Sequence, residues 1–249
     1  MNKLSKLFLL PNTLGGPVSD FSNSIAQNVA IEVNHFIVEE VRSARRLLRG
    51  LGYSGDFEDK FFYILNQHTD PADIPSYILP WQEGNAIAVI SEAGVPCVAD
   101  PGHQIVELAH QNQVRVIPVS GPSSILMALM ASGLSGQKFT FNGYLPREKN
   151  DRIQKFKQME AAAFQGETQL FMDTPFRNDQ SFEEACSVLK GDTYLCIATN
   201  LTNDDEMITT KTIDDWKSGR KPVINKKNVM FVLGRKSAST PRKELKRRF

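Results

Sequence analysis

The stretch NAIAVISEAGVPCVADPGH, residues 85–103, contains a strand signal, a long loop and the start of a helical pattern. Its first part, Asn85 to Ile90, is an apolar run of the length expected for a buried strand. The loop that follows carries two glycines, two prolines and two acids, and is about twice as long as an ordinary strand-to-helix connection. Because glycine lets a ligand approach the backbone closely, we predict that this loop binds a ligand.

Short apolar runs alternate with helical patterns on both sides of this stretch. This alternation predicts an α/β fold with mainly parallel sheets flanked by helices. The expected strands are Lys6–Leu10, His35–Val38, Phe61–Leu65, Ala86–Ser91, Val114–Val119, Phe139–Asn142, Gln169–Met172, Tyr194–Ala198, Met207–Thr210 and Val229–Leu233.

Capping residues predict where the helices begin and end. Ser19 or Asp20 is expected to cap a helix through Ala30, and Gly50 to end a helix that begins at Val41. Asp100 and Pro101 are expected to open a helix over 102–112 as its N-cap and first residue. The other expected helices span 123–132, closed by Gly133, and 147–164, 179–190 and 213–217.

Ten strands are many for one open sheet, so we expect two α/β domains. Ser120-Gly121-Pro122 marks the boundary, which gives an N-terminal domain of residues 1–119 and a C-terminal domain of residues 120–234. A basic tail follows at 235–249. A cleft between the two domains is the expected ligand site.

Composition restricts the class of protein. The chain has 249 residues, of which 41% are apolar, enough for a substantial core. The apolar run before Pro11 is too short for a signal peptide, and no stretch reaches the length of a membrane span. The three cysteines form no CxxC pair, which argues against disulfides or a zinc site. We therefore expect a cytoplasmic protein with no membrane partner.

The net charge of +1 is unevenly distributed. Residues 235–249 contain seven Lys or Arg and one acid, so the tail carries +6 and the rest of the chain −5. Such a tail either contacts nucleic-acid phosphates or is a solvated terminus, and the sequence favours neither.

Four loops follow expected strands and are expected to converge on the cleft. They are 11–16, 91–96, 120–124 and 173–177. No GxGxxG, P-loop, GxSxG or HExxH motif is present, which disfavours nicotinamide or nucleotide enzymes and nucleophilic hydrolases.

The segment 85–147 resembles the S-adenosylmethionine-dependent tetrapyrrole methylase superfamily. It is most similar to the branch that 2′-O-methylates a cytidine of small-subunit ribosomal RNA. That branch carries S-D-A-G-T-P, D-P-G, P-G-P-S-A and F-x-G-F-L-P in this order. The matching residues here are Ser91-Glu92-Ala93-Gly94-Val95-Pro96, Asp100-Pro101-Gly102, Ser120-Gly121-Pro122-Ser123-Ser124 and Phe141-Asn142-Gly143-Tyr144-Leu145-Pro146.

Similarity to the branch also covers Glu39-Glu40-Val41-Arg42, where it has E-D-T-R, and Asp173 to Arg177, where it has E-S/T-x-x-R. The sequence departs from the branch in three places. P-T-P-I-G-N-L becomes Pro11 to Pro17, R-E-L-T-K becomes Thr199 to Asn203, and K-G-E becomes Lys226 to Asn228. The loops expected to bind the methyl donor thus match the branch better than those expected to bind the substrate. The resemblance therefore supports binding of the methyl donor more strongly than it supports the particular nucleotide target.

The resemblance implies a homodimer that binds S-adenosylmethionine in the cleft and needs no metal. Ser120 to Ser124 and the amides there suit the donor's carboxylate, and Glu92 suits its ribose or amino group. Glu40 and Asp173 are candidate bases, with Arg42 and Arg177 as their partners. The expected cofactor-binding residues are Pro11, Glu92, Ala93, Gly94, Pro96, Ser120, Gly121, Pro122, Ser123, Ser124, Asn200 and Asn228.

These inferences favour a methyltransferase that acts on ribosomal or other structured RNA. The alternatives are a methylase of a small molecule such as a tetrapyrrole, and a cofactor-binding protein without catalysis. We also expect Gly94→Val to abolish binding of S-adenosylhomocysteine and to leave the fold intact, because it adds bulk only where a ligand would lie.

Overall fold

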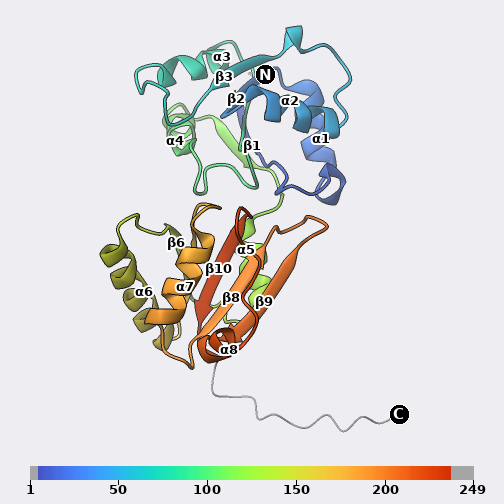
Figure 1. Ribbon diagram of the computed structural model, residues 1–249. Coiled ribbons are helices and arrows are strands. Elements are labelled where there is room, and N and C mark those ends of the chain that lie inside the picture. The colour runs from blue at the N-terminus through green and yellow to red at the C-terminus, as the bar shows by residue number, and fades with distance from the viewer. Residues whose placement is uncertain (1–4, 237–249) are drawn as a thin grey trace. The chain divides into compact units, whose positions relative to one another are not determined.

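The computed structural model describes residues 5–236 and separates into two compact units (Figure 1). The first unit runs to Ser124 and also includes Thr202–Asp204, and the second contains the rest of the described chain. Each unit has its own five-stranded sheet flanked by helices, so the expected α/β class with two sheets is confirmed. Within the described part of the chain, no helix is both long enough and apolar enough to cross a membrane.

The sheet of the first unit is parallel throughout and has the order β3-β2-β4-β1-β5. The central strand β4 is buried at all four positions, as expected for a parallel strand covered on both faces. Strand β1 lies between β4 and β5, so the loops that follow these three strands leave the same edge of the sheet side by side. The strands are β1 Lys6–Leu10, β2 His35–Val38, β3 Phe61–Ile64, β4 Ile87–Ile90 and β5 Arg115–Pro118.

Helices cover both faces of this sheet and build two separate cores. Helices α1 and α2 supply Val29, Leu47 and Leu48 to one core, while Trp81 and Ile105 from α3 and α4 belong to the other. The helices are α1 Ser24–Glu32, α2 Val41–Gly50, α3 Leu79–Gln82 and α4 His103–Gln111, with 3₁₀ turns at Val18–Asp20, Phe57–Asp59 and Ile74–Ile78.

Two expected helix starts in this unit are wrong. Ser19 and Asp20 lie in a 3₁₀ turn, and Asn23 caps α1 through hydrogen bonds from two backbone amides. The helix that begins at Val41 ends at Gly50 as expected, although Gly50 is its last helical residue and Leu51 is the C-cap.

The expected start of α4 at Asp100 and Pro101 is also wrong, because the loop continues further. Gly102, with φ +124°, is the residue before the first turn of α4. Cys97 and Ala99 have positive φ as well, so the preceding chain follows an irregular path that a helix cannot adopt.

The sheet of the second unit has the order β6-β7-β10-β8-β9, and only its β6–β7 pair is parallel. The expectation of mainly parallel strands therefore holds for the first sheet and is wrong for the second. The connection from β8 to β9 is too short for a crossover, so this pair is antiparallel. The strands are β6 Phe139–Tyr144, β7 Thr168–Met172, β8 Tyr194–Thr199, β9 Met207–Thr212 and β10 Val229–Gly234.

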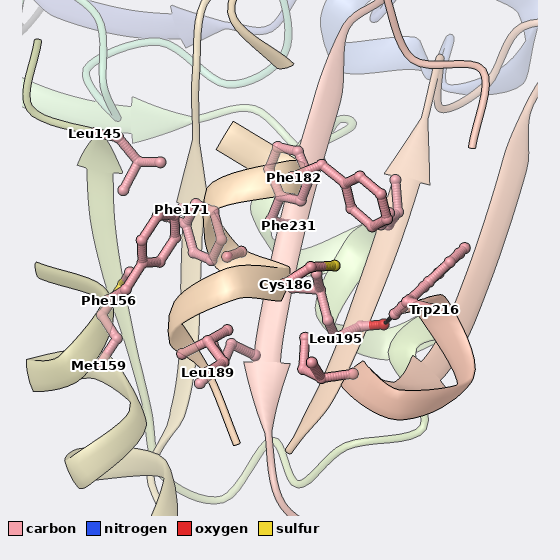
Figure 2. Close-up of a cluster of buried hydrophobic side chains, with 14 of the residues drawn as sticks. Leu145, Phe156, Met159, Phe171, Phe182, Cys186, Leu189, Leu195, Trp216 and Phe231 are labelled. Atoms are coloured by element: carbon pink, nitrogen blue, oxygen red, sulfur yellow. Dashed lines mark hydrogen bonds between the residues drawn. The ribbon is translucent and has the colours of Figure 1, made fainter. Parts of the chain in front are cut away.

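The main core of the second unit is aromatic and lies between this sheet and α6, α7 and α8 (Figure 2). Phe171 and Phe231 stack from adjacent strands at 5.0 Å between ring centroids, and Phe182 meets Trp216 edge to face at 5.6 Å. Trp216 donates its ring N–H to the Leu195 carbonyl at 2.9 Å, so its burial leaves no unpaired donor. The helices are α5 Ser124–Ser132, α6 Lys149–Phe164, α7 Asn178–Val188 and α8 Ile213–Ser218.

Only the first two residues of the expected basic tail, Arg235 and Lys236, belong to the described chain. Arg235 pairs with Asp192 at 2.9 Å and lies over the ring of Phe164. The rest of the tail, residues 237–249, lies outside the described residues.

Candidate functional site

The loops after β1 and β4 are joined by their backbones. Asn12 N donates to Gly94 O at 2.9 Å, and Gly94 N donates back to Asn12 O at 3.2 Å. Ser91 Oγ also donates to Gly94 O at 2.5 Å, which fixes the turn of the second loop. Two of the loops predicted from the sequence therefore meet at the edge of the first sheet.

Asn12 is a site residue that the sequence interpretation missed. It is buried, and its side-chain amide donates to the carbonyls of Ser91 and Glu92 at 3.1 Å each and to Ser43 Oγ on α2 at 3.3 Å. One amide thus ties three segments together. The only sequence signal was a polar residue two positions after the end of the first strand, which is too common to identify a site.

Gly94 and Gly121 lack a Cβ because other parts of the protein occupy that space. Gly94 has φ +73°, and a Cβ there would lie 3.1 Å from both Leu14 Cδ2 and Pro122 O. At Gly121 a Cβ would overlap the ring of Pro11. These contacts correct the expectation for Gly94→Val: valine would clash with neighbouring loops and strain the backbone, so the fold would not stay intact.

Glu40 caps α2 with both of its carboxylate oxygens. Oε1 accepts from Arg42 N at 2.8 Å and Oε2 accepts from Ser43 N at 2.6 Å. These backbone hydrogen bonds lower the pKa of Glu40, so the carboxylate is charged at neutral pH. Arg42, on the first turn of the helix, is exposed.

Three other acids at the same edge have raised pKa values, in contrast to the lowered pKa of Glu40. Burial raises the pKa of Glu39, and the neighbouring Glu92 raises it further. Burial also raises the pKa of Asp100, to about 6, with added repulsion from Glu39 and Glu92. The pKa of Glu92 is raised too, chiefly by burial. Like charges gathered in this way favour a cation beside them.

Glu39 is a second residue that the sequence interpretation missed. Its Oε1 atom is buried and has no hydrogen-bond partner within the described residues. A buried, unpaired carboxylate oxygen is costly unless something binds it. Two consecutive glutamates after β2 were visible in the sequence, but the resemblance drew attention to the second one only.

A cavity of about 360 Å³ lies in the first unit, next to these loops. Its lining is mostly apolar and includes Pro96, one of the predicted cofactor residues. Burial raises the pKa of the Cys97 thiol to about 11, with a further contribution from Asp100, so Cys97 is not a nucleophile at neutral pH. The lining residues are Leu9, Val95, Pro96, Cys97, Val98, His103, Val106, Pro118 and Val119.

In the second unit, the buried Asp173 and the partly exposed Arg177 form a clamp. Arg177 donates from Nε to Asp173 Oδ1 at 2.7 Å, from Nη2 to the same carboxylate, and from Nη2 to Leu145 O at 3.0 Å. Asp173 also accepts from Ser181 Oγ and from Thr174 N. The clamp joins the loops after β6 and β7, so its geometry suits a positioning role.

Asn200 and Asn228 lie together in the same unit. Asn200 N donates to Asn228 O at 2.8 Å, and Asn228 N donates to Asn200 Oδ1 at 3.1 Å. The side-chain amide of Asn200 also donates to Asp205, which is paired with Lys227 at 2.9 Å. Hydrogen bonds from Lys227 and Asn200 lower the pKa of Asp205.

The start of β10 and the loop after β7 are joined by further hydrogen bonds. Lys226 N donates to Pro175 O at 2.9 Å, and Asn178 Nδ2 donates to Lys227 O at 2.8 Å. The structure thus gathers the predicted residues of the second unit at one edge of its sheet. Those of the first unit gather around the loops after β1, β2, β4 and β5.

Comparison with known proteins identifies relatives of this chain. The family model described as Tetrapyrrole (Corrin/Porphyrin) Methylases matches residues 75–216. A protein of Escherichia coli O157:H7 named Ribosomal RNA small subunit methyltransferase I is 27% identical over 232 residues, which cover 93% of this chain and 78% of that protein. A protein of Vibrio cholerae serotype O1 with the same name is 30% identical over 202 residues, covering 81% and 67%.

Solved structures show the same fold. The crystal structure of the methyltransferase CobJ matches with a TM-score of 0.63 over 96% of each chain, at 14% sequence identity.

Proposed function

This chain belongs to the tetrapyrrole (corrin/porphyrin) methylase family and is an S-adenosylmethionine-dependent methyltransferase, and we propose that it methylates a ribose 2′-hydroxyl of small-subunit ribosomal RNA. The observation that carries the choice of substrate is the similarity to proteins named for small-subunit ribosomal RNA. It extends over 93% of the chain in the Escherichia coli protein and 81% in the Vibrio cholerae protein, so it includes residues of both units.

The acids of the first unit fit the charge of the methyl donor. S-adenosylmethionine has a positive charge on its sulfonium and another on its amino group. Glu39 offers a buried oxygen that no group in the described part of the chain pairs with, and burial together with neighbouring acids raises the pKa values of Glu39, Glu92 and Asp100, which supports a cationic ligand beside them. Binding of a cation would relieve this repulsion.

The rest of the proposed donor site comes from the neighbouring loops. The apolar cavity beside Pro96 is suited to an aromatic ring such as adenine. Hydroxyl groups of Ser123 and Ser124 and the backbone amides near them are suited to a carboxylate. The residues proposed to hold the donor are Pro11, Glu92, Ala93, Gly94, Pro96, Ser120, Gly121, Pro122, Ser123, Ser124, Asn200 and Asn228, together with Glu39 and Asp100.

The bound donor supplies an activated methyl group, and the protein has to position the acceptor and remove a proton. A carbon–oxygen bond forms as the carbon–sulfur bond breaks, and the hydroxyl proton passes to a base. We propose Glu40 for this role, because it is exposed and charged at neutral pH. Arg42 is exposed beside it and suits a phosphate of the acceptor strand.

Asp173 and Arg177 complete the proposed catalytic group as positioning residues. Their hydrogen bonds hold the loops after β6 and β7 and the first turns of α7. Holding reactants in the correct orientation contributes much of the acceleration in such displacements, so a shift of these loops would lower the rate. The homodimer and the cytoplasmic location expected from the resemblance are also part of this proposal.

The proposal is tested by incubation of the full-length protein with methyl-labelled S-adenosylmethionine and deproteinised small-subunit ribosomal RNA. We expect label on one ribose, resistant to alkaline cleavage of the adjacent phosphodiester. Glu40→Gln should lower the rate and leave binding of S-adenosylhomocysteine unchanged. Label in a tetrapyrrole pool and none in RNA would overturn the choice of substrate, and donor binding without transfer to either would favour a binding protein. Size-exclusion chromatography with light scattering measures the molar mass of the protein and so tests the proposed homodimer.

A further inference from the structure

Helix α2 presents four arginines on its exposed surface. Arg42, Arg45, Arg46 and Arg49 lie within eight residues, and no acid interrupts the helix Val41–Gly50. Their spacing of three and four residues places them along one side of the helix, opposite the buried Leu47 and Leu48. In Figure 1 this helix lies on the outside of the first unit, beside α1.

Two of these arginines rest on aromatic rings. The guanidinium carbon of Arg45 lies 5.1 Å from the ring centroid of Phe57 and 5.4 Å from that of Phe62. The guanidinium carbon of Arg49 lies 4.5 Å from Phe57 and 5.4 Å from Tyr53. Stacking holds the planar group by its face and leaves N–H donors at its edge for a ligand. Less side-chain entropy is therefore lost when these arginines bind.

The aromatic platform is itself anchored from below. Lys60 is buried, and its ammonium group donates to the carbonyls of Ile31 and Val33 at 2.9 and 2.6 Å. It also lies 4.3 Å from the ring centroid of Tyr53. Tyr53 packs against Phe57 at 5.3 Å between ring centroids, and Phe57 packs against Phe62 at 6.1 Å, so the rings beneath Arg45 and Arg49 support one another.

Neighbouring acids do not neutralise these arginines by direct pairing. Asp56, Glu58 and Asp59 are exposed on the adjacent turn. Among the ion pairs within 4 Å in the described part of the chain, none joins these acids to an arginine of α2.

We propose that Arg45 and Arg49 bind successive phosphates of the RNA substrate and so form a docking surface outside the catalytic group. The inference rests on the proposed function and deepens it. Arginine forks match phosphate oxygens, and a row of arginines along a helix is typical of a surface that follows a nucleic-acid backbone. The charge of Arg46 acts on Glu40 and Glu92, so we assign Arg46 to the proposed S-adenosylmethionine site and not to the docking surface.

The test measures the affinity of full-length protein for a fluorescent RNA hairpin at a series of KCl concentrations. The double variant Arg45→Gln/Arg49→Gln should lower affinity by on the order of tenfold at moderate salt. It should also reduce the slope of log affinity against log salt by about 1.4 to 1.8, since each lost phosphate contact removes about 0.7 to 0.9. Arg45→Lys/Arg49→Lys should keep most of the salt dependence of the wild-type protein but only part of its affinity. An ammonium group keeps the charge, but it neither stacks on a ring like the planar guanidinium nor offers a fork of N–H donors.

Arg115→Gln is the matched control, because Arg115 is exposed at the start of β5, at the other end of the sheet from the loops. An equal loss in this control would show that diffuse charge binds the RNA and would overturn the proposal. So would a double variant with unchanged affinity and slope, or equally tight binding of a polyglutamate of similar charge. Thermal stabilisation by S-adenosylhomocysteine should be unchanged in every variant, which shows that each one folds.

Failure of this inference and failure of the proposed function are distinguishable. If the wild-type protein binds the hairpin through these arginines but transfers no methyl group to ribosomal RNA, the function is wrong and the surface stands. If the double variant methylates RNA with an unchanged KM, the surface is wrong and the function stands.

Discussion

The two sheet edges that carry the predicted residues treat their acids in opposite ways. In the first unit, Glu39, Glu92 and Asp100 repel one another and have raised pKa values. In the second unit, Asp173 is held by Arg177, and Asp205 by Lys227 and Asn200. The first edge retains unbalanced charge suited to a cationic ligand, whereas the second uses its charge to hold loops in place. Four changes of sequence test this contrast.

The largest effect is expected at Arg152, the buried cation of the second unit. It is 2% exposed, pairs with Glu184 at 2.5 and 2.8 Å, and donates to the carbonyls of Pro146 and Arg147. Arg152→Met removes the buried cation that pairs with Glu184 and leaves the carbonyls of Pro146 and Arg147 without this donor, so we expect the free energy of unfolding in urea to fall by about 3 kcal/mol. Lys221→Met, which breaks the exposed pair with Glu183, is the control and should leave the midpoint within error. Equal effects would mean that burial does not set the strength of these pairs.

Gly94→Ala should have the next largest effect, and should act on the first edge. A Cβ at φ +73° strains the backbone and crowds Pro122 O, so we expect a loss of about 2 kcal/mol in stability and loss of stabilisation by S-adenosylhomocysteine. Gly133→Ala is the matched control, because Gly133 has φ +69° and open space at its Cβ position. It should cost only the backbone strain and leave ligand binding intact. If Gly94→Ala still binds S-adenosylhomocysteine, the loop that contains Gly94 does not form part of the donor site.

Asp100→Asn tests the raised pKa directly. The folded protein holds the proton of Asp100 up to about pH 6, whereas the unfolded chain releases it near its ordinary value of 3.8. Folding therefore takes up a proton between these values, and the contribution of Asp100 to stability falls as pH rises through this window.

Asparagine cannot lose a proton, so the variant should match wild type near pH 4 and melt a few degrees higher at pH 7. Melting curves from pH 4 to 7.5 measure this difference. Glu107→Gln, which removes an exposed acid from α4, controls for the change in net charge. A difference that does not vary with pH would show that burial and the neighbouring acids do not raise the pKa of Asp100.

The smallest effect is expected for the helix cap. Glu40→Ala removes both acceptors at the start of α2, and we expect the midpoint of thermal unfolding to fall by about one to three degrees. Glu32→Ala, at the exposed end of α1, is the control. Glu40 adds to the raised pKa of Glu92 but is not among the charges that act on Asp100, so this change should not move the pH dependence attributed to Asp100. A change in that dependence would show that the charge of Glu40 also reaches Asp100.

The sequence predicted the strands well, because strand signals are local. The structure has strands within two residues of every predicted position, including β1 at Lys6–Leu10 and β2 at His35–Val38. Strand order depends on distant contacts, so the antiparallel pairing of β10 with β7 and β8 could not be read from any one segment. Helix starts failed where the backbone follows an irregular path, as at Cys97 and Ala99 before α4.

The candidate site was predicted in outline and incompletely in detail. That the loops after β1 and β4 would meet followed from the rule that parallel strands end at one edge, and the Asn12–Gly94 backbone pair confirms it. Asn12 and Glu39 were missed because their importance comes from burial. The side chain of Asn12 donates three hydrogen bonds, and one carboxylate oxygen of Glu39 has no hydrogen-bond partner among residues 5–236. Burial of a polar atom depends on which segments fold over it, and the local sequence does not report that.

The central place of β10 affects how the chain can fold during synthesis. All strands of the first sheet lie before residue 119, so this sheet can assemble while the rest of the chain is still being translated. The second sheet has to wait for Val229–Gly234, which inserts between β7 and β8. Until then, both neighbours expose unpaired edges that invite aggregation on the ribosome. A premature stop even a few codons before Val229 would thus remove the middle of a sheet and leave the first unit as the only folded product.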